Sequence, residues 1–133
     1  MLITQNMLNV AIDNVRKSFE LMIDFKEEKF EKLQKNEDYI NYLNKNIVDF
    51  TTNALSIEFP IEGSQTIGLF LKVSADLERV GDHAVNIALR AKNLYEENRH
   101  FSHEAMNLNV LLIRLMLLKI TLIKLIMSSL KDK

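Results

Sequence analysis

Apolar residues between positions 69 and 97 recur at alternating steps of three and four, which is the spacing of one face of an α-helix. This apolar row consists of Phe70, Val73, Leu77, Val80, Ala84, Ile87, Ala91 and Leu94. Polar residues repeat the same spacing on another side, as Lys72, Asp76, Arg79, His83, Asn86, Arg90, Asn93 and Glu97. The pattern therefore predicts one long central helix with a buried seam and a solvated stripe.

A third row on this helix combines small and apolar residues with two acids. It comprises Leu71, Ser74, Glu78, Gly81, Asp82, Val85 and Leu89. At about 100° per residue, the two acids lie between the seam and the stripe, so the row predicts a second contact face. Glycine in mid-helix costs about 1 kcal/mol relative to alanine. Gly81 is therefore expected either to let another helix approach closely, which is the favoured cause, or to open room beside the acids.

Two helices are predicted before the central one. The first runs from about Thr4 to Leu33, with a charge-laced second half and a seam formed by Leu8, Ile12, Val15, Phe19 and Met22. The second has Asn36 as its N-cap. Its seam, which is expected to face that of the central helix, consists of Ile40, Leu43, Ile47, Phe50, Ala54 and Ile57. Glu58–Phe59–Pro60 ends this helix, because the residue before a proline is pushed out of helical geometry. Gly63 then completes the turn, and Ser64 caps the central helix.

After a break at residues 98–101, a fourth helix is predicted from its cap, Ser102, to about Leu130. Between positions 108 and 127, its run of Leu, Ile, Val and Met is interrupted only by Asn109, Arg114, Lys119, Thr121 and Lys124. A transmembrane span has about this length, but three cations spread through the helix argue against one. A helix that is apolar nearly all round is instead expected to be buried on most sides, partly by a second copy of the chain. We therefore predict a homodimer through the C-terminal helix.

Composition sets the limits of these predictions. The 133 residues are expected to form a single domain, residues 1–133. One proline and three glycines favour few turns and long elements, so the predicted fold class is all-α, an antiparallel bundle of three long helices plus a strongly apolar fourth. A net charge of −1 gives no electrostatic reason to expect nucleic acid as a partner. The absence of cysteine excludes disulfides and thiolate metal sites.

Two further observations concern location and catalysis. Residues 1–6 have neither the basic region nor the long apolar core of a signal peptide, so a cytoplasmic location is expected. A Gly-rich phosphate loop, a Ser-His-Asp arrangement and an HExxH motif are all missing from the sequence. The sequence therefore predicts that the chain is not an enzyme.

The two acids of the central helix lie one turn apart, so their side chains approach within about 6 Å and repel each other modestly. A hard cation such as iron, manganese, magnesium or calcium would convert this repulsion into coordination by Glu78 and Asp82. The alternative is structural, with Arg79 paired to Asp82 and Glu78 accepting hydrogen bonds from a neighbouring helix. The residues alone leave both interpretations open.

The stretch that holds these acids, DLERVGDHAVNIA, resembles the signature of the PhoU domain, in which two acids separated by three residues precede an Asn-Ile-Ala run. The resemblance covers one repeat, about residues 7–97, and leaves an extra helix at about 102–130. It implies a bundle of long helices, usually as two three-helix repeats, and in some members metal clusters held by paired acidic motifs. Residues 37–41 fall where the family places its other motif. The implied ligands are thus Glu78, Asp82, Glu37 and Asn41, around iron, zinc, manganese or magnesium. Glu37, Asn41 and Asn44 flank the seam at Ile40 and are expected to face the two acids of the central helix across the bundle. Asn41 departs from the family pattern, since a carboxylate often stands there, and Asn44 is neutral too.

The resemblance also implies a function, namely regulation of phosphate uptake. A single repeat in this family often forms the cytosolic tail of a sodium-dependent phosphate cotransporter, which would place the chain at the inner face of the cell membrane beside the transporter domain. The alternatives are a free-standing regulator of an ABC phosphate importer and its sensor kinase, a metal-carboxylate bundle enzyme and a purely structural dimerisation module.

Overall fold

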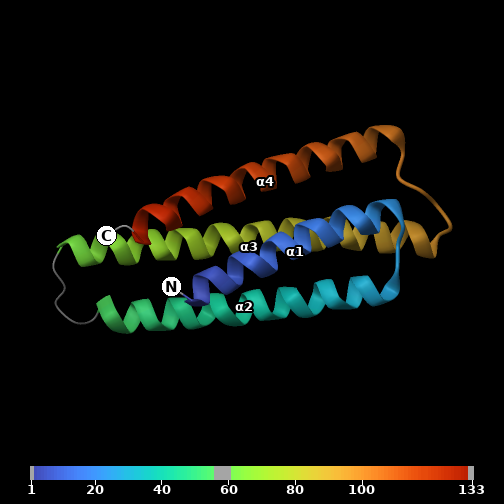
Figure 1. Ribbon diagram of the computed structural model, residues 1–133. Coiled ribbons are helices and arrows are strands. Elements are labelled where there is room, and N and C mark those ends of the chain that lie inside the picture. The colour runs from blue at the N-terminus through green and yellow to red at the C-terminus, as the bar shows by residue number, and fades with distance from the viewer. Residues whose placement is uncertain (1, 56–60, 132–133) are drawn as a thin grey trace.

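The computed structural model describes residues 2–55 and 61–131, which form four helices (Figure 1). These are α1 (Leu2–Ile23), α2 (Glu27–Leu55), α3 (Ile61–Glu96) and α4 (His103–Lys131). Successive helices run in opposite directions, and α4 crosses obliquely over α1 and α3, on the side away from α2. The predicted all-α antiparallel bundle is confirmed.

The core lies where the apolar seams of α1, α2 and α3 meet. Its buried residues from these helices include Met7, Leu8, Ala11, Val15, Ile40, Leu43, Ile47, Val73, Leu77, Val80 and Ile87. The predicted facing of the second and central seams is confirmed for these residues. Two predicted members are wrong, because the side chain of Phe50 is 72% exposed and that of Phe19 is 38% exposed. The side chain of Ala54 and the whole of Ile57 lie outside the described part of the chain.

The first helix is shorter than predicted, because the chain leaves helical geometry at residues 24–26 instead of continuing to Leu33. Phe25 turns inward at this break and stacks on Tyr95 of α3, with ring centroids 4.9 Å apart. It also packs on Phe30 in the first turn of α2. Glu27 and Glu28, at the start of α2, complement the positive end of its dipole. A helix boundary can therefore form here without glycine or proline, because an aromatic side chain anchors the turn.

Asn36 is not an N-cap, because it lies inside α2. Its amide group donates hydrogen bonds to Asn14 Oδ1, at 2.8 Å, and to Asp13 Oδ2, at 2.9 Å, both on α1. Asn14 is fully buried and donates in turn to the carbonyl oxygen of Leu33. Satisfying a buried amide on both sides fixes the register of α1 against α2.

The ends of α3 differ in how well the sequence predicts them. Gly63 and Ser64 lie within the helix, so the predicted turn and cap at these residues are wrong, and the predicted stop at residues 58–60 lies outside the described residues. The break after α3 is confirmed. Asn98 has a φ of 55°, and the backbone N–H groups of Arg99 and Asn98 donate to the carbonyl oxygens of Leu94 and Tyr95. This pattern is a Schellman motif with asparagine in the left-handed position.

The predicted cap of α4 is confirmed, because the backbone N–H of Ala105 donates to Ser102 Oγ at 3.1 Å. Below this cap, one face of the helix packs on α1 and α3 and buries Asn109, Ile113, Met116, Ile120, Ile123 and Met127. In the described part of the chain, no helix combines the length and the apolar character that crossing a membrane requires.

One residue of the predicted solvated stripe of α3 is buried in this packing. Asp76 lies 3.3 Å from Lys119 Nζ of α4, measured from its Oδ1 atom. The expectation that Asp76 is solvated is wrong because α4 covers this part of α3. A second polar contact joins the same two helices, in which Arg90 donates to Asn109 Oδ1 at 2.9 Å.

Candidate functional site

The two acids of α3 face α2 across the point where the two helices come closest. Gly81 makes this approach possible, since a Cβ built on it would lie 2.5 Å from Glu37 Oε2 and 3.5 Å from Ile40 Cδ1. The carboxyl group of Glu37 therefore lies directly over the backbone of Gly81, beside Asp82. The expectation that Gly81 admits a neighbouring helix is confirmed, and the space that it leaves is filled by an acid.

Three carboxyl groups share this region, and the pKa of Glu37 is raised there. Burial raises the pKa of Glu37 to about 8, with further contributions from its hydrogen bond to Asp82 and from the negative charges of Asp82, Glu78 and Asp38. Glu37 is therefore mostly protonated at neutral pH and donates to the carboxylate of Asp82. Its Oε2 atom is buried and has no hydrogen-bond partner.

Glu78, the other acid of α3, accepts a hydrogen bond from an amide group of α2. Asn44 of α2 donates from Nδ2 to Glu78 Oε2 at 2.8 Å. Ser74 of α3 donates to Oδ1 of the same amide, and its oxygen lies 3.8 Å from the sulfur of Met7 on α1. Ser74, Asn44 and Glu78 thus form a chain of hydrogen bonds that runs from the buried core to the acids. Such a network ties α2 and α3 together in one register.

The sequence-predicted residues do not all meet. Glu37 interacts with Glu78 and Asp82, of which Asp82 is exposed, whereas Asn41 is exposed and is not among the groups that act on Glu37. The structural alternative is confirmed in one part, because Glu78 does accept a hydrogen bond from a neighbouring helix. The other part of that alternative was a pairing of Arg79 with Asp82. Arg79 is instead paired with Asp76, with 3.9 Å between Nη1 of Arg79 and Oδ1 of Asp76.

The expectation that Asn44 faces the acids of the central helix is confirmed by its hydrogen bond to Glu78. Ser74 is the contact to which the sequence assigned no role beyond its place in the second contact face. It stands four residues before Glu78 on that face, so helical spacing could have placed it at this contact once the facing of the two helices was established.

The residue types present suit a hard cation, since carboxylate oxygens are its preferred ligands. The unpartnered oxygen of Glu37 is an atom that an ion would satisfy. In the arrangement described here, however, no three histidine, cysteine or acidic side chains of the described residues converge on a point that an ion could occupy. A proton held by Glu37 removes one of the three negative charges, and the amide of Asn44 donates a hydrogen bond to Glu78.

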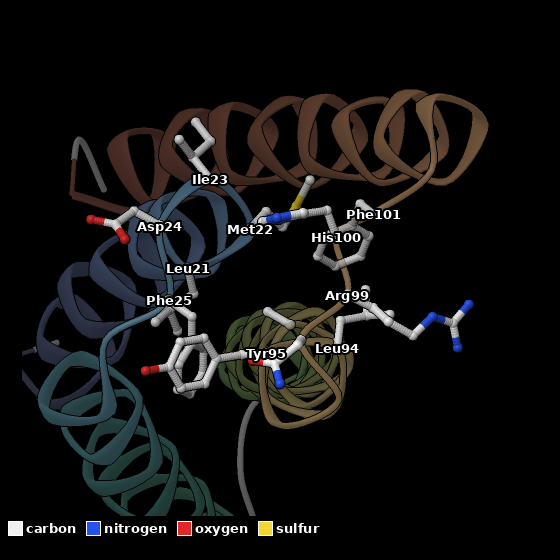
Figure 2. A pocket seen from close by; sticks show the side chains of 12 residues that line it. Leu21, Met22, Ile23, Asp24, Phe25, Leu94, Tyr95, Arg99, His100 and Phe101 are labelled. Carbon is white, nitrogen blue, oxygen red and sulfur yellow. The ribbon is translucent and has the colours of Figure 1, made fainter.

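A cavity of about 410 Å³ lies at a different place, where α1 and α3 end and residues 98–101 connect to α4 (Figure 2). Phe25, Tyr95, Leu94 and Phe101 supply much of its wall. In Figure 2 the charged groups of Asp24 and Arg99 point to opposite sides, away from the centre. The cavity therefore has aromatic and aliphatic walls without charged groups directed at a common ligand.

Comparison with known proteins places this arrangement in a family. Residues 4–91, which cover α1, α2 and most of α3, match the model of the PhoU domain. The chain is also similar to a phosphate-specific transport system accessory protein PhoU homolog of Clostridium acetobutylicum, with 35% identity over 68 residues, half of this chain. These residues span 31% of the length of that protein. No solved structure matches the chain. The three-helix unit that carries Glu37, Glu78 and Asp82 is thus the matched region, and the chain belongs to the PhoU domain family.

Proposed function

We propose that this chain is a non-enzymatic regulatory domain of phosphate uptake and forms the cytosolic region of a sodium-dependent phosphate cotransporter. The observation that carries the proposal is the extent of the family match, which includes a single three-helix unit and leaves α4 outside. The polar side chains that meet between α2 and α3 are hydrogen-bonded to one another and hold the helices in register. This arrangement supports a role in binding and signalling, with no catalytic step assigned to it.

A free-standing regulator is the second candidate. The relative from Clostridium acetobutylicum is named as an accessory protein of a phosphate-specific transport system, and this chain matches less than a third of its length. Under this alternative, the chain would act on a separate importer instead of a transporter domain of its own. The two candidates differ in whether the transport that they regulate depends on sodium.

Sodium dependence separates these candidates. The DNA segment that encodes the chain is deleted, and uptake of radioactive phosphate is measured at low and high external phosphate, in sodium and in potassium medium. We expect the deletion to change the response of uptake to phosphate only in sodium medium. The same change in both media would favour a free-standing regulator of an importer that does not use sodium. Uptake that is unaffected by the deletion under all conditions would refute a role in phosphate transport.

We also propose that Glu78 and Asp82 bind a divalent or trivalent cation, helped by Glu37 and Asn41. The support for this proposal is the closeness of three carboxyl groups and the buried, unpartnered oxygen of Glu37. Binding would require the side chains to move toward one another, since metal ligands must lose their protons and converge.

The test of metal binding compares thermal unfolding with and without iron, zinc, manganese or magnesium. An ion that binds the folded protein raises its melting temperature. Replacement of Glu78 by glutamine together with Asp82→Asn should abolish any such rise. The matched control carries Glu31→Gln and Asp49→Asn, two exposed acids of α2. An equal rise in the first double variant would show that these acids are not the ligands.

We further propose that the exposed apolar face of α4 is covered in the assembled protein by a second copy of the chain. The transporter's membrane domain is the alternative occupant of this face. Either assignment explains why a helix that is already packed on α1 and α3 carries a second row of large apolar side chains.

A further inference from the structure

The outer face of α4 has a regularity of its own. Six leucines lie along it at alternating steps of three and four: Leu108, Leu111, Leu115, Leu118, Leu122 and Leu125. We call this row the outer leucine seam. Each of its side chains is between 52% and 67% exposed. This spacing is the heptad pattern of a coiled coil, in which such a row inserts between the side chains of a facing helix.

The direction of the outer leucine seam is fixed by the packing of the opposite face. The inner row of α4 is buried against α1 and α3, so the helix cannot rotate about its axis without exposing Ile120 and Ile123. The contacts of Lys119 with Asp76 and of Asn109 with Arg90 hold the helix to α3 at two points of its length. The leucines therefore face away from the rest of the protein in a defined direction.

The seam is complementary to itself. Its steps are three, four, three, four and three, so it reads the same in both directions about a midpoint between Leu115 and Leu118. A two-fold axis that passes through this midpoint, perpendicular to the helix, superimposes the row on an antiparallel copy of itself. Two-fold symmetry of this kind is the commonest arrangement of soluble dimers.

Resting on the self-association proposed above, we propose that two copies of the chain pair through their α4 helices as an antiparallel coiled coil. Leu115 of one copy then packs in the same layer as the Leu118 position of the other. The next layers outward pair position 111 with position 122, and position 108 with position 125. In an antiparallel pair of helices these mixed layers repeat along the whole row.

The charges on either side of the seam favour the antiparallel direction over the parallel one. In a parallel pair, Arg114 of each copy would lie beside Lys119 of the other, because residues five apart across such a seam are neighbours. The helix has no aspartate or glutamate between positions 105 and 131 that would compensate Arg114, and Lys119 is compensated only by Asp76 of α3, which lies away from the seam. In the antiparallel register, Arg114 lies beside the Thr121 position and Lys119 beside the Leu112 position, and the like-charge contacts disappear.

Cysteine cross-linking distinguishes the two directions, and the chain has no native cysteine to interfere. The variants Leu108→Cys and Leu125→Cys are purified separately, then oxidised alone and as an equimolar mixture. In the antiparallel pair, each cysteine lies roughly 25 Å from its own copy, from the rise of 1.5 Å per residue, and a disulfide needs Cα atoms within about 7 Å. We therefore expect a disulfide-linked dimer in the mixture and none in either variant alone. Tyr42→Cys, exposed on α2, serves as the control for random collision.

Each other outcome decides against the proposal. Efficient linkage of Leu108→Cys alone would show a parallel pair. Linkage no faster than that of Tyr42→Cys in every sample would show that the outer leucine seam does not meet a second copy. Phosphate uptake is measured separately in the deletion experiment, so a failure of the antiparallel pairing leaves the regulatory function standing, and the converse is also true.

A second measurement tests whether the seam is needed for association. The double variant Leu115→Glu with Leu122→Glu places two charges in the seam, and we expect it to sediment as a monomer while native protein sediments as a dimer. Circular dichroism checks that the variant keeps its helix content. The matched control is Leu89→Glu, which changes an exposed leucine of α3 and should leave the dimer intact. A native monomer, or a folded double variant that remains dimeric, would overturn the proposal.

Discussion

The helices α3 and α4 have similar patterns of apolar residues, but they differ in how much of their surface the rest of the chain covers. Each carries two contact faces at heptad spacing. The apolar seam of α3 is covered by α1 and α2, and the part of the acidic face around Ser74 and Gly81 is covered by α2, while Asp82 and Leu89 at its edge are exposed. Only the inner face of α4 is covered, while its outer leucine seam stays exposed. The spacing of residues thus reveals that a helix has a second contact face, but it does not reveal whether the partner belongs to the same chain.

The chemistry of the two second faces explains the difference. The polar groups of α3 that pack against α2 require specific partners, because an acid or amide that loses water without gaining a hydrogen bond is costly. Asn44 and Glu37 of α2 are such partners. The outer leucine seam needs only another apolar helix of matching spacing, and a copy of itself meets that requirement. A polar face therefore requires one particular neighbouring helix, whereas the outer leucine seam can also pack on a copy of itself.

The largest expected effect is the loss of stability when a leucine is truncated, and it should differ between the covered seam of α3 and the exposed outer leucine seam of α4. Leu77 of α3 is 0% exposed, so Leu77→Ala should lower the free energy of unfolding by roughly 2–5 kcal/mol at any protein concentration. Leu115→Ala should lower it only at concentrations at which copies associate. Urea unfolding at a low and a high concentration measures both. A concentration-independent loss of similar size in Leu115→Ala would show that α4 is buried within the single chain after all.

The sequence predicts most of the fold because seams and caps are local signals. The long α3, the facing of α2 and α3, the end of α3 near Asn98 and the cap at Ser102 all follow from spacing and from single side chains. The α1–α2 boundary does not, because a contact between Phe25 and Tyr95, distant in sequence, creates it. The exposure of Phe50 is equally non-local, since position 50 continues the seam of α2.

The sequence also predicts part of the candidate site. Helical spacing identifies Glu78 and Asp82 as partners in one face, and the family resemblance adds Glu37. The sequence cannot show that Glu37 keeps a proton. Protonation depends on how closely Gly81 lets the carboxyl group of Glu37 approach the backbone of α3, and on how much water is excluded there. The same closeness leaves Asn41 outside and brings Asn44 to Glu78.

The second expected effect concerns the acidic face of α3 and depends on pH. The pKa of Glu37 rises from 4.5 to about 8 on folding, so the folded state holds a proton that the unfolded chain releases between these values. The stabilisation is fully present below about pH 4.5 and is lost as pH rises toward 8. Because Glu37 is only partly buried and solvent screens it, we expect a loss on the order of 1–2 kcal/mol.

The variant Glu37→Gln isolates this component, because the amide donates to Asp82 but cannot ionise. Its melting temperature should exceed that of native protein at pH 9 and differ little at pH 5. Glu31→Gln changes an exposed acid of the same helix and is the control. If the difference between Glu37→Gln and native protein were the same at both pH values, Glu37 would not hold a proton in the folded state.

A smaller effect concerns the polar contact that joins the two helices of the comparison. Asp76→Asn keeps the shape of the buried side chain but removes its charge opposite Lys119. Half-exposed ion pairs contribute about 0.2–1 kcal/mol, so we expect a loss in this range that shrinks at high salt. Asp49→Asn, an exposed substitution on α2, should have no effect. A loss that is independent of salt would mean that packing around Asp76, and not its charge, holds α4.

The smallest effect tests why α3 tolerates a glycine in its middle. Alanine is favoured over glycine by about 1 kcal/mol inside a helix, but a Cβ at position 81 would meet Glu37 Oε2 at 2.5 Å. In native protein the gain from the higher helix propensity of alanine is opposed by a loss, because Glu37 must move and weaken its hydrogen bond to Asp82. Gly81→Ala should therefore change the free energy of unfolding by less than about 0.5 kcal/mol. With Glu37→Ala in place, the obstacle is gone and the next atom lies at 3.5 Å, an ordinary contact distance. There, Gly81→Ala should raise the free energy of unfolding by about 0.5–1 kcal/mol.

Urea unfolding of the two single variants and the double variant gives the coupling between the positions. Equal effects of Gly81→Ala in both backgrounds would show that the glycine serves the approach of the α2 backbone rather than the accommodation of an acid.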